Sequence, residues 1–274
     1  MQQRITLMGI LNVTPDSFSD GGRWLSESAL ETRIEQLLAE GADIIDVGGE
    51  STRPFAEPVG VAEELRRVIP AIRKIRQRSK IPISVDTTKA AVAGEAIAAG
   101  ATMINDISAL RHDPAMIEVA RSFAGPVIIM HMQGTPGDMQ VVPRYGDVVA
   151  EINAFFTERI DWLEQNGVDR SRIIVDPGIG FGKTMEHNLA ILRNIAAFRR
   201  HGCPVLIGHS RKSFLGQLLG VPTEERDWPT AMVSACCARQ GADILRVHDV
   251  RNTGYAVRLA QILDCGGMAA SCVG

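Results

Sequence analysis

The feature that most constrains the fold of this sequence is its regular alternation of short apolar segments with longer segments of helical spacing. The longer segments place apolar residues on one helical face, as Leu30, Ile34 and Leu37 do. The short segments are rich in Ile and Val and are typical of buried strands. We predict strands at residues 5–13, 43–47, 83–85, 103–107, 127–130, 173–175, 205–207 and 244–247.

The boundaries between these segments favour parallel strands joined by helices. Gly41, Gly100 and Gly241 each stand just before a predicted strand, where glycine commonly ends a helix. Strands that are apolar on both faces require helices on both sides of a parallel sheet. Eight such units in 274 residues predict an α/β fold, a single-domain (β/α)8 TIM barrel over residues 1–274. A doubly wound sheet is the main alternative, but residues 14–23 lack the glycine fingerprint expected after its first strand.

Composition excludes several classes of protein. Hydrophobic residues make up 45% of the chain, which is enough for a large core, and the net charge of −3 disfavours a nucleic-acid partner. No apolar run approaches the ~20 residues of a membrane span, and no signal peptide is evident. The five cysteines are odd in number and lack CxxC spacing, so we expect free thiols and a cytoplasmic location.

Polar residues stand at the end of nearly every predicted strand. In a barrel these ends meet at one face, where such enzymes place their active sites. Helix capping could explain any single member, but the whole set favours a site for a polar ligand. The set consists of Asn12, Asp46, Asp86, Asn105, Asp106, His131, Asp176, Ser210, Arg211, Lys212, Arg246 and His248.

The residue types in this set indicate a ligand with two parts. Asp86, Asn105 and Asp176 suit the edge of a heterocycle that presents several N–H donors, and Lys212 can donate to a ring carbonyl or nitrogen.

A second group suits an anion. Arg53, Arg246 and His248 are donors suited to phosphate oxygens, and Ser213 begins a helix whose N-terminus favours negative charge.

Residues 178–184, GIGFGKT, resemble a phosphate-binding P-loop. That motif needs a glycine five positions before Gly182, where this chain has Pro177. We therefore expect a flexible loop between strand and helix rather than a nucleotide site, and a Lys183 that contributes little to activity.

Eight segments together resemble the dihydropteroate synthase family. They are GILNVTPDSFSDGG, DVGGESTRP, ISVDTTKA, INDIS, IMHMQG, DPGIGFGKT, GHSRKSFLG and RVHDV, which extend from residue 9 to residue 250. The resemblance implies a (β/α)8 barrel of folate biosynthesis that is a sulfonamide target. It also implies a homodimeric transferase that condenses 6-hydroxymethyl-7,8-dihydropterin pyrophosphate with p-aminobenzoate, releasing pyrophosphate with Mg²⁺ bound.

The resemblance assigns roles to individual positions. The catalytic positions are Arg53, Lys212, Arg246 and His248. The pterin-binding positions are Asp86, Asn105, Ile107, Met130, Asp176, Lys212 and Arg246. The p-aminobenzoate pocket matches Phe18, Thr52, Arg53, Pro54, Phe181 and Ser213, and Asn12 matches a position that handles the metal.

Three positions depart from the family pattern. Ala90 and Ile179 stand where Pro and Phe are expected in many members, and His209 precedes the SRK triplet. None is one of the predicted ligand-binding polar positions.

Two alternative functions remain. One is a pterin-dependent methyltransferase barrel, which would not need Arg53 or the SRKS and RVHDV segments. The other is a protein that binds a pterin or a phosphate without catalysis.

Overall fold

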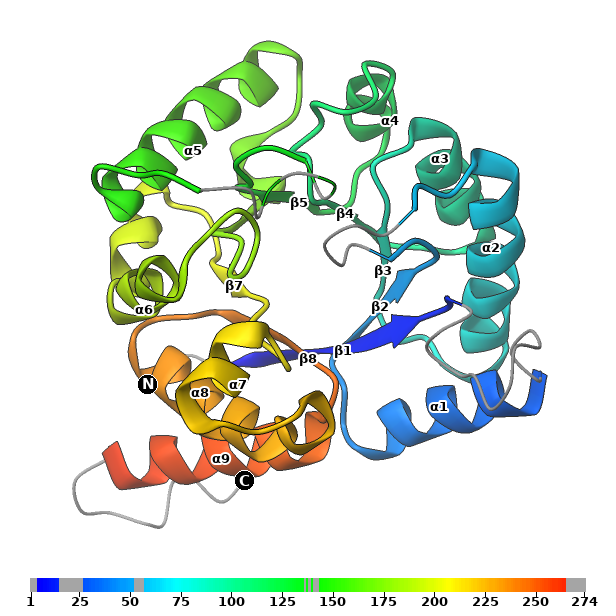
Figure 1. The fold of residues 1–274 in the computed structure, drawn as a ribbon. Coiled ribbons are helices and arrows are strands. Elements are labelled where there is room, and N and C mark those ends of the chain that lie inside the picture. Colours follow the sequence, from blue (N-terminus) through cyan, green and yellow to red (C-terminus); the bar gives the residue numbers. More distant parts are fainter. Residues whose placement is uncertain are drawn as a thin grey trace.

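A computed structural model describes residues 4–14, 27–51, 57–135, 137, 139 and 143–264. Within these residues, parallel strands form a barrel with helices around its outside (Figure 1). The strands are β1 (Thr6–Asn12), β2 (Ile44–Gly48), β3 (Ile83–Asp86), β4 (Met103–Asp106), β5 (Val127–Met130), β6 (Ile173–Asp176), β7 (Leu206–Ile207) and β8 (Ile244–Val247). Every predicted strand is confirmed, and the predicted TIM barrel is correct.

Helices follow the strands in the order that the periodicity predicts. The α-helices are α1 (Glu27–Ala39), α2 (Val61–Arg78), α3 (Ala90–Ala99), α4 (Met116–Ser122), α5 (Val148–Gln165), α6 (Met185–Arg193), α7 (Ser213–Leu219), α8 (Asp227–Arg239) and α9 (Val250–Asp264). Short 3-10 helices are η2 (Arg170–Arg172), η3 (Ile195–His201) and η4 (Thr223–Glu225). Among the described helices, none is long and apolar enough to cross a membrane.

The sheet order identifies a barrel rather than a doubly wound sheet. The strands pair in parallel in the order β6-β5-β4-β3-β2-β1-β8-β7. A parallel bridge between Val175 and Val205 joins β6 to the chain entering β7, which nearly closes the barrel. The carboxyl ends of all the described strands therefore lie at one mouth.

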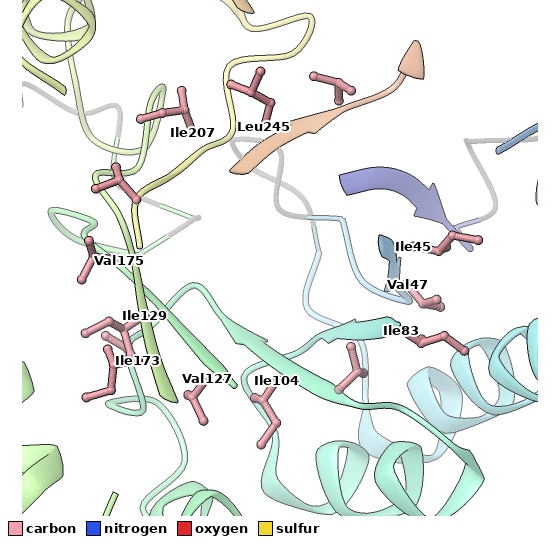
Figure 2. Close-up of a cluster of buried hydrophobic side chains, with 14 of the residues drawn as sticks. Ile45, Val47, Ile83, Ile104, Val127, Ile129, Ile173, Val175, Ile207 and Leu245 are labelled. Atoms are coloured by element: carbon pink, nitrogen blue, oxygen red, sulfur yellow. The ribbon is translucent and has the colours of Figure 1, made fainter. Parts of the chain in front are cut away.

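Alternation along each strand separates two apolar layers. Outward side chains pack under the helices, and Figure 2 shows part of this ring, including Ile45, Val47, Ile104 and Val175. Inward side chains nearer the amino ends fill the barrel. This inner cluster consists of Met8, Ile44, Met103, Ile128, Ile174, Leu206 and Ile244. The next inward residues toward the mouth include Asp46, Asn105, Asp176 and Arg246, so the interior changes from apolar to polar along the barrel axis.

The predicted helix-ending glycines adopt left-handed backbone conformations. Gly41, Gly100 and Gly241 have φ values of 84°, 115° and 95°. These angles strain any residue with a Cβ atom, which explains the recurrence of glycine before β2, β4 and β8.

Gly9 of β1 tests how tightly the helices pack on the barrel. A Cβ atom on Gly9 would lie 2.8 Å from Leu37 Cδ2 and 3.2 Å from Val250 Cγ2. Both neighbours are fully buried. Because the core cannot easily yield, we expect Gly9→Ala to lower the free energy of unfolding by about 1–3 kcal/mol, measured by urea unfolding.

Gly94 of α3 provides the matched control for this change. A Cβ atom there would meet nothing within 4 Å. Gly94→Ala should therefore raise the free energy of unfolding by about 0.5–1 kcal/mol, because alanine has the better helix propensity. Equal effects of the two substitutions would contradict the packing that we describe around β1.

Candidate functional site

Arg246 of β8 lies at the centre of the barrel mouth. Its Nε donates to Asp46 Oδ2 of β2 at 2.6 Å, and its Nη2 donates to Asp86 Oδ2 of β3 at 2.8 Å. Asn105 of β4 donates weakly to the same Asp46 carboxylate, at 3.3 Å. One guanidinium group therefore connects carboxylates that are 200 and 160 residues away in sequence.

Strand register places several of the predicted polar residues at one level. Asn12, Gly48, Asp86 and Asn105 are successive register partners across β1 to β4. An ideal Cβ on Gly48 would lie 3.7 Å from both Asn12 Oδ1 and Asp86 Oδ2. Since glycine has no side chain, these two oxygens face a shared space above Gly48.

Asp176 and Lys212 form the opposite side of the mouth. Asp176 Oδ1 accepts a hydrogen bond from the Gly178 amide at 2.8 Å. Lys212 Nζ lies 4.0 Å from the centre of the Phe181 ring, in a cation–π contact.

Burial brings the pKa values of these groups closer to neutrality. Burial raises the pKa of Asp176 to about 6, against the effects of the Gly178 amide and Lys212. Burial lowers the pKa of Lys212 to about 8, and the charge of Arg246 adds to this shift. Burial raises the pKa of Asp86 to about 7, although Arg246 opposes that shift. Such perturbed groups gathered at one end of a barrel are typical of a functional site.

His248 follows β8 and is oriented by Ser210. Ser210 Oγ lies 2.9 Å from His248 Nδ1 and accepts a hydrogen bond from the His248 amide at 3.1 Å. Burial lowers the pKa of His248 well below its ordinary value, and the nearby Arg211 and Arg246 lower it further. The imidazole is therefore neutral, and its contact with Ser210 fixes the orientation of the ring.

Two members of the predicted polar set have local structural roles instead. Asp106 accepts hydrogen bonds from the Ser108 amide at 2.7 Å and from the Leu110 amide at 3.1 Å, and so caps its own turn. Arg211 forms a bidentate ion pair with Asp227 of α8, at 2.6 and 2.7 Å. For these two residues the structure therefore supports the alternative of a local structural role, which the sequence left open for each member of the set.

The loop over residues 178–184 is packed rather than flexible, which corrects the expectation from sequence. Gly178 has a φ of 71°, and a Cβ there would lie 2.0 Å from His131 O. Gly182 has a φ of 61°, and a Cβ there would lie 2.5 Å from Gln133 O. The glycines therefore allow the loop to lie directly on the chain after β5. Lys183 is buried against protein atoms rather than presented to a phosphate group.

Three apolar residues among the predicted binding positions lie together. Ile107, Met130 and Phe181 belong to one buried cluster with Met132 and Met139. Sequence reasoning missed the two additional methionines, because neither stands at the end of a strand. Ser213 is the first residue of α7 and is exposed.

The remaining predicted residues, Phe18, Thr52, Arg53 and Pro54, lie outside the described residues. The chain on either side of residues 52–56 is described. Glu50 Oε1 accepts a hydrogen bond from the Val59 amide at 2.8 Å, and Lys89 Nζ donates to Glu50 Oε2 at 2.5 Å.

Comparison with known proteins identifies the family. Residues 8–248 match a family described as pterin binding enzyme. The dihydropteroate synthase of Escherichia coli K12 is 48% identical over 255 residues, covering 93% of this chain and 90% of that protein. This chain belongs to the dihydropteroate synthase family of pterin-binding enzymes.

Solved structures of dihydropteroate synthases share the fold closely. The Yersinia pestis enzyme in a sulfonamide drug complex has a TM-score of 0.91 and 43% identity, covering 96% of this chain and 95% of that one. The Xanthomonas albilineans enzyme in complex with 7,8-dihydropteroate has a TM-score of 0.87 and 41% identity, covering 97% and 96%.

The three departures from the dihydropteroate synthase pattern are buried residues outside the polar set. Ala90 begins α3, and its amide donates to Asp113 Oδ2 at 2.8 Å, a hydrogen bond that proline could not make. Ile179 is fully buried in the core. His209 is fully buried, with its Nε2 2.9 Å from Ser234 Oγ.

Asp46 and Ser210 are two members of the polar set to which the sequence assigned no individual role. Asp46 is fully buried and binds Arg246, and Ser210 orients His248. The sequence did contain a signal for the role of Asp46. It stands inside the apolar strand IIDVG, and a buried carboxylate needs a partner.

Asp176→Asn tests the electrostatic cost of this site. The folded pKa of about 6 exceeds the ordinary value of 3.8, so the fold favours the protonated acid. The protonated acid therefore makes its full contribution to the free energy of unfolding below pH 3.8. This contribution is lost as the pH rises through about 6. We therefore expect the neutral variant to be more stable than the original chain above pH 6, by up to about 3 kcal/mol, and about equally stable near pH 4.

Thermal unfolding across pH 4–8 measures this difference. The control is Asp161→Asn, which removes an exposed carboxylate 3.4 Å from Arg170 and should change stability by less than about 1 kcal/mol at every pH. If the difference in stability between Asp176→Asn and the original chain did not change with pH, burial would not be destabilising the charged carboxylate.

Proposed function

We propose that this chain is a dihydropteroate synthase that joins 6-hydroxymethyl-7,8-dihydropterin pyrophosphate to p-aminobenzoate, releasing pyrophosphate. The observation that carries the proposal is the arrangement of two acidic groups, Asp86 and Asp176, with Asn105, Lys212 and Arg246 around one barrel mouth. The bound 7,8-dihydropteroate of the Xanthomonas albilineans relative gives it a named product.

The pterin ring is the part of the substrate that best fits the described residues. The carboxylates of Asp86 and Asp176 accept hydrogen bonds from ring N–H groups, and Lys212 donates to the ring carbonyl or a ring nitrogen. Arg246 has its Nε and Nη2 committed to Asp46 and Asp86, so its guanidinium plane is fixed and offers a flat surface to the ring. Ile107 and Met130 supply the apolar wall.

Pyrophosphate departure is assigned to donors around the same mouth. Arg246 and His248 come from the end of β8, and Arg53 comes from the segment after β2. They stabilise the negative charge that develops when the carbon–oxygen bond breaks and its electron pair stays with pyrophosphate. The electron-rich pterin stabilises the positive carbon, so we favour a dissociative substitution.

The second substrate needs orientation more than activation. The aniline nitrogen of p-aminobenzoate forms the bond to the positive carbon and loses a proton to solvent. Phe181 and Ser213, together with Phe18, Thr52 and Pro54, are proposed to surround this ring and its carboxylate. A neutral aniline is already nucleophilic, so the rate depends on how it is positioned.

Mg²⁺ is proposed as the metal that accompanies pyrophosphate. No cluster of three His, Cys, Asp or Glu side chains among the described residues forms a metal cage. Mg²⁺ in phosphate sites commonly uses one or two protein oxygens and takes its other ligands from phosphate and water. The amide oxygen of Asn12, which faces the space above Gly48, fits that pattern. When bound, Mg²⁺ would neutralise charge on the leaving pyrophosphate.

The alternative functions are disfavoured by specific residues. A pterin-dependent methyltransferase has no need for His248 and Arg246 beside an anion site. A protein that only binds the pterin has no need for the residues assigned to p-aminobenzoate, such as Phe181 and Ser213. Formation of dihydropteroate and pyrophosphate from the two substrates and Mg²⁺ would distinguish these functions from the proposed one.

We also propose a homodimer in a reducing cytoplasm. Helices α8 and α9 pack side by side on the outside of the barrel (Figure 1). They expose Trp228, Met232, Tyr255, Leu259 and Leu263, each 58–72% exposed. These residues are spaced by four along each helix, so both helices present a row of apolar side chains to the surface, as protein interfaces often do. The described cysteines, Cys203, Cys236 and Cys237, are free thiols, which fits the proposed compartment.

Lys212→Ala tests the proposed reaction. The substitution removes the cation that donates to the pterin, so we expect kcat/KM to fall at least about 100-fold, which is the loss of a charge-assisted hydrogen bond. Product formation is measured with and without EDTA, and EDTA should abolish it. Lys80→Ala, an exposed lysine before β3, is the control and should retain full activity. Full activity of Lys212→Ala would remove this lysine from the site.

Met232→Glu combined with Leu259→Glu tests the proposed dimer. Two charges on the apolar face of α8 and α9 would have to be buried in the interface, so we expect a monomer by analytical ultracentrifugation. Ala91→Glu adds a charge to the exposed face of α3 and should leave the dimer intact. A double variant that sediments like the original chain would show that this face is not the interface.

A further inference from the structure

Lys183 is a buried cation that the proposed chemistry does not use. It is only 3% exposed. Its Nζ lies 2.9 Å from Phe181 O, 3.1 Å from His131 Nδ1 and 3.3 Å from His131 O. Within the described residues, no carboxylate lies close enough to form an ion pair with it.

An ammonium group in this position is costly to the fold. Burial lowers the pKa of Lys183 to about 7, and the charge of Lys212 adds to that shift while Asp176 opposes it. A methionine of similar length would fill the same space without a charge. The three neutral acceptors around Nζ are therefore the feature that calls for a lysine.

The acceptors connect two parts of the barrel mouth. His131 follows β5, and Phe181 lies in the loop between β6 and α6. Lys183 fixes the backbone of Phe181 through its carbonyl, while the ring of Phe181 contacts Lys212 Nζ at 4.0 Å. One lysine therefore fixes the main chain of this phenylalanine, and a second lysine contacts its ring.

The same loop has further anchors along its length. The Gly180 amide donates to Asn188 Oδ1 at 2.8 Å, and Tyr145 OH donates to Gly182 O at 2.9 Å. Together with the Gly178 amide on Asp176, these bonds anchor every second residue from Gly178 to Gly182. Such repeated anchoring is expected where a loop must present a side chain in one orientation.

We propose that Lys183 is a positioning residue that acts through Phe181, with Tyr145 as a second anchor of the same loop. It keeps the Phe181 ring in place as a wall of the p-aminobenzoate pocket and against Lys212. The proposal rests on the proposed function for the identity of that second substrate. It differs from the expectation from sequence that Lys183 contributes little to activity.

Two substitutions test the proposal at different severity. Lys183→Met keeps the length of the side chain and removes its hydrogen bonds to Phe181 and His131. Tyr145→Phe removes only the hydroxyl that donates to Gly182, so it remains informative if the first variant does not fold. Asn153→Ala is the matched control, because it removes a buried 2.9 Å hydrogen bond to His201 in the helical layer between α5 and η3.

Hydrogen exchange gives a readout that is independent of activity. The amides of Gly178, Gly180 and Phe181 all donate hydrogen bonds within or beside the loop. We expect exchange in a peptide covering residues 178–184 to be at least about tenfold faster in Lys183→Met, and unchanged in peptides from α9.

Steady-state kinetics tests whether this order serves the site. We expect KM for p-aminobenzoate to rise about tenfold in Lys183→Met and about threefold in Tyr145→Phe, with KM for the pterin substrate changed less than about twofold. A purely structural role would instead reduce the active fraction, lowering kcat while leaving both KM values unchanged. Asn153→Ala should show that second pattern or no change.

The outcomes separate this proposal from the proposed function. Unchanged exchange in residues 178–184, or faster exchange with unchanged KM for p-aminobenzoate in both variants, would overturn the role of Lys183. An original chain that forms no dihydropteroate would overturn the proposed function. The exchange experiment would then still show whether Lys183 orders the loop.

Discussion

The ion pairs of Arg246 with Asp46 and Asp86 determine where the barrel interior changes from apolar to polar. A buried guanidinium or carboxylate is strongly destabilising unless it is paired, so these three groups have to lie together. Burial opposes the charge on Arg246, but the adjacent carboxylates outweigh it and raise its pKa. The inner apolar cluster lies below this layer and the mouth lies above it. The polar site therefore lies on a rigid core whose strands are linked by these charges, which keeps its groups in fixed positions.

The buried charged groups of the site also lower the stability of the fold. Asp86 and Asp176 have raised pKa values and Lys212 and Lys183 have lowered ones, in each case because burial disfavours the charged form. These shifts mean that the fold would be more stable with neutral groups at the same positions. A ligand with N–H donors and an anionic tail would supply hydrogen-bond and ionic partners to these groups. The binding energy of such a ligand offsets the cost of keeping these charges out of water.

The sequence predicted the barrel almost completely because its pattern follows from a physical requirement. Strands covered on both faces must be apolar throughout, and glycine is needed where a helix ends in a left-handed conformation.

The polar residues at the strand ends were also predictable as a group. The direction in which each of their side chains points was harder to predict, although alternation along a strand contains that information. Asn105 and Asp106 are neighbours in β4, so only one of them can point into the barrel, and Asp106 caps a turn outside it. The link between Arg246 and Asp46 spans 200 residues, and no local pattern indicates which carboxylate an arginine will meet.

The glycine-rich loop after β6 shows why a motif needs its packing to be interpreted. The spacing of the glycines excluded a P-loop but did not explain why the glycines and Lys183 occur in this loop. In the fold, Gly178 and Gly182 lie where a Cβ atom would collide with the main chain of His131 and Gln133. Such close approach brings carbonyl groups of two segments within reach of one side chain, and Lys183 supplies the donors that these carbonyls require. Glycines and lysine are thus parts of one arrangement, in which tight backbone packing creates buried acceptors and a buried cation satisfies them. The similarity to a phosphate-binding loop arises because both structures need a compact backbone beside a lysine, with carbonyl oxygens in place of phosphate oxygens.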